Sequence, residues 1–150
     1  MAQSLARLIT HLTFSTKLRR PLITPELRAD LNAYLSGILN KLESSAIEIN
    51  CMAEHAHVLF SLSRKRSLAE VVEELKKGSS KWIKTKSAAL CDFYWQAGYG
   101  AFSVSQSNTD DVREYIVNQE EHHRKMTFQE EFRALLAKHQ IEFDERYMWD

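Results

Sequence analysis

Apolar and polar residues alternate in four short segments of the chain, which is the pattern of β-strands with one buried face. The segment 55–62 shows it most clearly, because Ala56, Val58 and Phe60 occupy alternate positions. His55 and His57 occupy the intervening positions and must point to the opposite face. From this pattern we predict strands at residues 8–15, 46–51, 55–62 and 98–105.

Apolar residues recur at helical spacing in four other segments. The first begins with Thr24 and Pro25, a capping residue followed by a proline at the first helical position. The second follows the capping residue Ser67, and the third opens at Asn108 and continues to about Lys125. We therefore predict helices at residues 25–42, 68–83, 108–125 and 128–138, with an acidic tail at 141–150.

The elements follow one another in the order β-α-β-β-α-β, and two helices come last. This order predicts an α+β protein with a ferredoxin-like βαββαβ sheet and additional C-terminal helices. A hydrophobic fraction of 44% and a charged fraction of 27% are close to globular averages. No segment has the composition of a linker, so we expect one domain over residues 1–150.

The cysteines and the N-terminal segment indicate the compartment. Cys51 and Cys91 are 40 positions apart and form no CxxC motif, which excludes a disulfide scaffold and a cysteine-type zinc site. The first residues do not combine a basic stretch with an apolar core, and no apolar run reaches the length of a membrane span. We expect a cytoplasmic protein with no membrane partner.

Charge is distributed unevenly although the net charge is zero. Residues 1–90 contain 14 Lys and Arg and 8 Asp and Glu, whereas residues 91–150 contain 6 and 12. A first half of charge +6 could bind a polyanion, or it could attract the second half of charge −6 within one chain or between two copies. Scattered solvated charge is the simplest alternative.

Two groups of residues could carry chemistry. His55 and His57 share a strand face, where two imidazoles can bind one metal ion, although most His-x-His strands bind none. Tyr115 and Gln119 are four positions apart and would share one helix face, as would many unremarkable pairs.

A basic segment could bind backbone phosphates, which prefer Lys, Arg and Ser groups. A solvated helix face is the alternative. The candidate DNA-binding residues are Arg64, Lys65, Arg66, Lys77, Ser79, Ser80, Lys81 and Lys84.

Taken together, these motifs resemble the single-tyrosine HUH transposases, the insertion-sequence-200-like enzymes and their REP-associated relatives. HUH denotes His-hydrophobic-His, here His55-Ala56-His57. Ala56 is smaller than the usual residue, and Glu54 stands where the family often has Asp or Asn. The resemblance covers about residues 8–149 and rests on that motif, Gly78–Trp82, Trp95–Val104 and Tyr115–His123.

The resemblance implies a function and a site. It makes Tyr115 the nucleophile and His55, His57 and Gln119 the ligands of one Mg²⁺ or Mn²⁺ ion. The implied reaction cleaves and rejoins single-stranded DNA through a 5′-phosphotyrosine, with no nucleotide cofactor, and the sequence indeed lacks GxxxxGK[ST]. The implied partners are hairpin ends of a mobile or repeat element and a second copy in a homodimer, although the REP-associated relatives can also work as monomers.

Two other functions fit the same residues. The fold could bind single-stranded nucleic acid on its sheet without cutting it, as a domesticated transposase would. Alternatively, the histidines could serve a metal-dependent hydrolase that uses water and forms no covalent intermediate.

Overall fold

The computed structural model describes residues 2–150. Its strands are β1 (Ile9–Ser15), β2 (Ala46–Cys51), β3 (His55–Ser61) and β4 (Gly100–Ser103). Its α-helices are α1 (Pro25–Lys41), α2 (Leu68–Lys84), α3 (Thr109–Val117), α4 (Gln119–His122) and α5 (Phe128–Lys138).

The strands form one antiparallel sheet in the order β2-β3-β1-β4. The two central strands are therefore β1 and β3, which are far apart in the sequence. Their register pairs Leu12 with Val58 and Thr13 with His57, so apolar residues meet on one face and polar residues on the other. This arrangement confirms the predicted α+β, ferredoxin-like fold.

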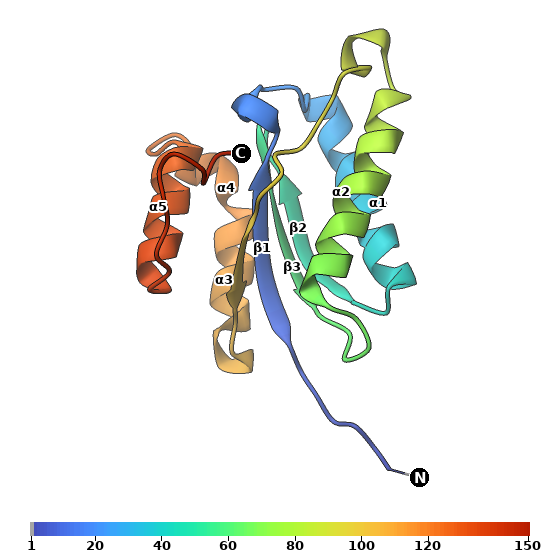
Figure 1. Ribbon diagram of the computed structural model, residues 1–150, viewed down its shortest axis with the longest axis vertical. Coiled ribbons are helices and arrows are strands. Elements are labelled where there is room, and N and C mark those ends of the chain that lie inside the picture. Colours follow the sequence, from blue (N-terminus) through green and yellow to red (C-terminus); the bar gives the residue numbers. More distant parts are fainter. Residues whose placement is uncertain (1) are drawn as a thin grey trace.

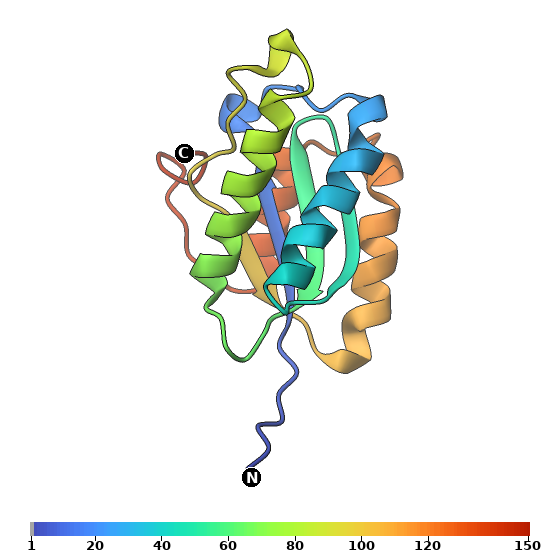
Figure 2. The same ribbon diagram turned by 90° about the vertical axis from the view of Figure 1, so that its right-hand side faces the viewer.

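Helices α1 and α2 cover the apolar face, as Figure 2 shows from their side. Leu12, Phe14, Val58 and Phe60 project from the sheet into a core that these helices complete. Both helices begin as predicted, because the hydroxyls of their capping residues accept bonds from backbone amides in the first turn.

Helices α3 and α5 cover the other face (Figure 1). Helix α3 packs on β2 and β3 through a cluster that includes Ile116 and Leu59, whereas α5 packs on β4 through Phe132 and Phe102. Helix α5 approaches closely, because a Cβ added at Gly100 would lie 2.8 Å from Cε1 of Phe132. The polar face of β1 and β3 lies between these two clusters.

Two predicted elements differ from those observed. The helix predicted at residues 108–125 is interrupted at Asn118, whose φ of −91° and ψ of 22° leave helical geometry and separate α3 from α4. The fourth strand is shorter than residues 98–105, because only Gly100–Ser103 pairs with β1. In the part of the chain that the structure describes, no helix combines the length and apolar character needed to cross a membrane.

Candidate functional site

The histidine pair lies side by side on the face of β3 that α3 and α5 cover. The alternation of the strand sends Ala56 and Val58 to the opposite core, and the ring centroids of His55 and His57 are 5.2 Å apart. Both side chains are completely buried. The C-terminal helices thus turn the face of the sheet that carries the histidines into a second interior.

The tyrosine and the glutamine reach this pair from the other side. Tyr115 lies near the end of α3, and the bend at Asn118 makes Gln119 the first residue of α4. Oε1 of Gln119 lies 3.1 Å from Nε2 of His55, and the rings of Tyr115 and His57 are 6.0 Å apart. One chain therefore brings together all four residues that the sequence singled out.

A fifth side chain, Glu131 of α5, lies in the middle of this group and was not predicted. Its Oε1 lies 2.8 Å from Nε2 of His57 and 3.7 Å from Nε2 of His55. Its Oε2 accepts hydrogen bonds from the Tyr115 hydroxyl and, at 3.0 Å, from Nε2 of Gln119. Glu131 is thus the one residue that contacts all four others.

A sequence signal for Glu131 existed. It lies three residues after Phe128 and four before Leu135, so it occupies the apolar stripe by which α5 docks. An acidic residue inside such a stripe is buried when the helix docks, and a buried carboxylate requires partners.

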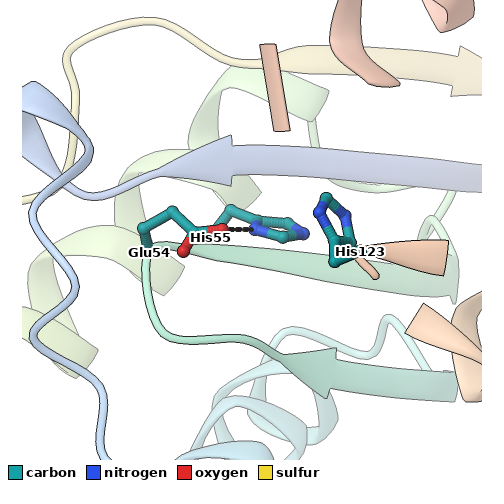
Figure 3. A group of neighbouring side chains, drawn as sticks. All are labelled: Glu54, His55 and His123. Atoms are coloured by element: carbon teal, nitrogen blue, oxygen red, sulfur yellow. Dashed lines mark hydrogen bonds and ion pairs between the residues drawn. The ribbon is translucent and has the colours of Figure 1, made fainter. Parts of the chain in front are cut away.

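His55 is oriented by a residue outside the group. Oε1 of Glu54 lies 2.7 Å from Nδ1 of His55, so Nδ1 donates to the carboxylate, and in the neutral imidazole the lone pair is then on Nε2. Figure 3 shows Glu54 on one side of His55 and His123 on the other, where the two imidazole rings are 4.5 Å apart. Two overlapping groups of potential metal ligands result, Glu54–His55–His123 and His55–His57–Glu131.

His57 has a similar neighbour, His11 of β1, which sequence reasoning also missed. Nε2 of His11 lies 2.8 Å from Nδ1 of His57, so either ring can donate to the other. The register explains the contact: His57 pairs with Thr13, and His11 is two residues along on the same face.

Burial and charge set the protonation states of the acidic groups. Burial alone would raise the pKa of Glu131, but Nε2 of His123, 3.3 Å from Oε1, and the hydrogen bond from Nε2 of His57 outweigh it and hold this pKa well below its usual range. Burial, then the charge of Glu131, raises the pKa of Tyr115 well above that of a free phenol. At neutral pH the group thus holds a carboxylate and a protonated tyrosine.

His11 and His57, which are hydrogen-bonded to each other, are neutral. Burial, reinforced by the neighbouring His57, lowers the pKa of His11 to about 3. Burial also lowers the pKa of His57, against the opposing influence of Glu131. Neutral imidazole is the form that binds metal ions.

A cavity of about 480 Å³ opens between α3 and α5 beside the site. Tyr115, His11 and Glu131 contribute to its wall. The tyrosine side chain is therefore partly accessible from outside, although the histidine pair is not.

A second cavity, of about 510 Å³, lies against Glu54 and His123. Three basic residues, Arg19, Arg124 and Lys125, contribute to its wall. None of them was among the candidate DNA-binding residues, which all lie between residues 64 and 84.

The basic residues that were singled out lie elsewhere. Helix α2 carries Lys77, Ser79, Ser80, Lys81 and Lys84, and it lies on the side of the sheet opposite α3 (Figure 1). Arg64, Lys65 and Arg66 lie in the connection between β3 and α2.

Within this set, the serines are engaged in the fold. Ser79 is buried, donates to the carbonyl of Leu75 at 2.6 Å and accepts from Nε1 of Trp95 at 2.9 Å. Ser79 therefore cannot face a phosphate at the surface, because the indole of Trp95 occupies that side of it. Lys77 and Lys81 are exposed.

Comparison with known proteins places the chain by its fold and by its family. None of the curated proteins matches the sequence. A solved structure of a candidate transposase from Deinococcus radiodurans R1 is 21% identical, with a TM-score of 0.62 over 79% of this chain and 98% of that one. A REP-associated tyrosine transposase bound to a REP hairpin is 15% identical, with a TM-score of 0.59 over 82% of this chain and 74% of that one. The family model "Transposase IS200 like" matches residues 4–119. The chain therefore belongs to the IS200-like transposase family.

Proposed function

We propose that this protein is a metal-dependent transposase that cleaves and rejoins single-stranded DNA through Tyr115. The observation that carries the proposal is the convergence of the Tyr115 hydroxyl, two histidines and Gln119 at one buried position beside a cavity. Family membership supports the same reaction.

The residues present fit a divalent ion. His55 and His57 each have a partner at Nδ1, Glu54 and His11 respectively, which allows both Nε2 atoms to act as ligands. Nε2 of His55 and Oε1 of Gln119 then face each other 3.1 Å apart as two acceptors, an arrangement that a shared cation stabilises. Mg²⁺ or Mn²⁺ held there would polarise a phosphodiester oxygen and offset negative charge around the phenol.

Tyr115 performs the transfer in this proposal. Its phenol oxygen forms a bond to phosphorus while the bond from phosphorus to the 3′ oxygen breaks, and the phenol proton is balanced by the proton that the 3′ oxygen takes up. The products are a 5′-phosphotyrosine and a free 3′-hydroxyl. Because the ester bond is conserved in the protein link, rejoining by the reverse step requires no nucleotide cofactor.

The proposed substrate is a DNA hairpin end, and the proposed assembly is a cytoplasmic homodimer. The hairpin in the REP-associated structure belongs to that protein, and we extend it here by family membership. Arg19, Arg124 and Lys125 line the cavity against Glu54 and His123 and would hold the strand. A longer DNA could also reach the exposed lysines of α2 and Arg64, Lys65 and Arg66.

Replacement of the nucleophile tests the proposal. Tyr115→Phe should bind hairpin DNA but form no covalent adduct on denaturing electrophoresis with a labelled strand and Mn²⁺. Tyr94→Phe is the matched control, because Tyr94 is exposed and stacks with Lys84 away from the site. An adduct in Tyr115→Phe would identify another nucleophile. Cleavage by wild type without an adduct would indicate the hydrolase, and binding without cleavage the non-catalytic module.

A further inference from the structure

Glu131 has the environment of a functional residue. It is 1% exposed, although it belongs to a helix whose neighbouring Glu130 faces solvent. Phe128 and Phe132 pack in one cluster with Phe102 and Trp149 and fix the position of α5, so the fold holds the carboxylate in place. Burial of a carboxylate is unfavourable in free energy unless the charge is paired, and buried carboxylates of this kind are concentrated at functional sites.

We propose that Glu131 is a ligand of the metal ion, so that the centre consists of His55, His57, Gln119 and Glu131. The inference rests on the proposed metal site and adds to it a charged ligand from the C-terminal helix. The tyrosine helix and the histidine strand would then be joined to α5 through one ion.

Three distances among the four proposed ligand atoms are compatible with a shared ion. Donor atoms that each lie about 2.1 Å from one ion are about 3.0 Å apart at a right angle and about 3.4 Å apart at the tetrahedral angle. Oε1 of Glu131 lies 2.8 Å from Nε2 of His57 and 3.7 Å from Nε2 of His55, which brackets these values. The distance of 3.1 Å between His55 and Gln119 also agrees.

The second oxygen of Glu131 has a separate role. Oε2 accepts from the Tyr115 hydroxyl and from Nε2 of Gln119, while Oε1 faces the histidines. One-oxygen ligation would leave both of those bonds intact and keep the tyrosine next to the ion. The bond to Gln119 also turns the amide so that its Oε1 faces His55.

The donor set favours a particular class of ion. Two imidazoles, one amide oxygen and one carboxylate suit Mn²⁺ or another first-row divalent ion better than Mg²⁺, which prefers oxygen ligands and retains its waters. The carboxylate also reduces the charge of the bound centre by one.

Calorimetric titration of the full-length, DNA-free protein with MnCl₂ tests the inference. Glu131→Gln keeps the size of the side chain and removes its charge, and it should weaken Mn²⁺ binding by more than about 10-fold, the loss that even an outer-shell partner can cause. Glu130→Gln is the matched control, because it lies one residue away and is exposed. It should bind Mn²⁺ like wild type.

Each other outcome has a defined meaning. Equal affinity in Glu131→Gln and wild type overturns the inference, and tighter binding in Glu131→Gln also overturns it by showing that the carboxylate competes with the ion. If Gln119→Ala and His57→Ala bind like wild type too, the proposed metal site itself is wrong.

A second readout uses the unaltered protein. Electron–nuclear double resonance of Mn²⁺ in protein labelled with ¹³C at its glutamate carboxyls should show one strongly coupled carbon. Absence of that coupling overturns the inference even if Glu131→Gln fails to fold.

Discussion

At the scale of single residues, the buried charge of Glu131 and its histidine partners depend on one another. The carboxylate stays ionised because His123 and His57 compensate its burial, and His57 is itself completely enclosed. Removal of one partner from such a pair leaves the other buried and incompletely satisfied, which costs more than removal of both. The histidines of the site thus contribute to stability as well as to ligand binding.

This dependence predicts non-additive stabilities. In EDTA, His57→Ala should lower the free energy of unfolding by about 1–3 kcal/mol, because Glu131 loses a hydrogen-bond donor at 2.8 Å. The double variant His57→Ala/Glu131→Ala should be about 1–3 kcal/mol more stable than the sum of the single effects requires. Urea denaturation of the four proteins measures the coupling. Strictly additive effects would show that the two side chains do not stabilise each other.

At the scale of elements, the site depends on how closely α5 docks on β4. Gly100 permits this approach, because any Cβ there would overlap the rigid ring of Phe132 at 2.8 Å. Glu131 is adjacent to Phe132 in the sequence, so a displacement of α5 also displaces the carboxylate. Helix position and site geometry are coupled through this one contact.

The coupling predicts opposite effects of two glycine substitutions. Gly100→Ala should destabilise the protein by about 1–3 kcal/mol through overpacking. Gly37→Ala is the matched control in α1, where nothing lies within 4 Å of the added Cβ, and it should stabilise by up to about 1 kcal/mol through helix propensity. Urea midpoints compare the two. A neutral Gly100→Ala would mean that α5 is free to adjust.

Much of the element order could be predicted from the sequence, because it depends on local signals. Periodicity and the caps at Thr24 and Ser67 located α1 and α2, and alternation located β3 with both histidines on one face. The bend at Asn118 was not predicted, because residues 109–123 contain neither Pro nor Gly to mark it.

Two members of the site, His11 and Glu131, were not predicted for a different reason. His11 and Glu131 reach His57 only through strand pairing and helix docking, over sequence separations of 46 and 74 residues. Local pattern does not determine which distant faces meet. Tyr115 and Gln119 could be singled out from the sequence because they are only four residues apart, within one local motif.

At the scale of the whole molecule, the two halves of opposite charge meet within one chain. The acidic second half supplies α3, α4 and α5, which pack on a sheet built mostly from the basic first half. The ion pair of Arg20 with Asp92, at 3.5 Å, joins a basic residue of the first half to an acidic residue of the second. The charge asymmetry is thus partly satisfied internally, and the homodimer remains a proposal that it does not require.

The last prediction concerns how many chains build one site. Tyr115, Gln119 and both histidines converge within a single chain, and Glu131 of the same chain holds the tyrosine hydroxyl. A mixture of Tyr115→Phe and His57→Ala proteins, each inactive alone, should therefore stay inactive, because every chain carries one lesion in its own site. Adduct formation after mixing is the measurement, with differently tagged chains to establish that subunits exchange and melting curves to establish that both variants are folded. Recovered adduct would show that tyrosine and histidines come from different chains, since a mixed dimer would then contain one site free of both lesions.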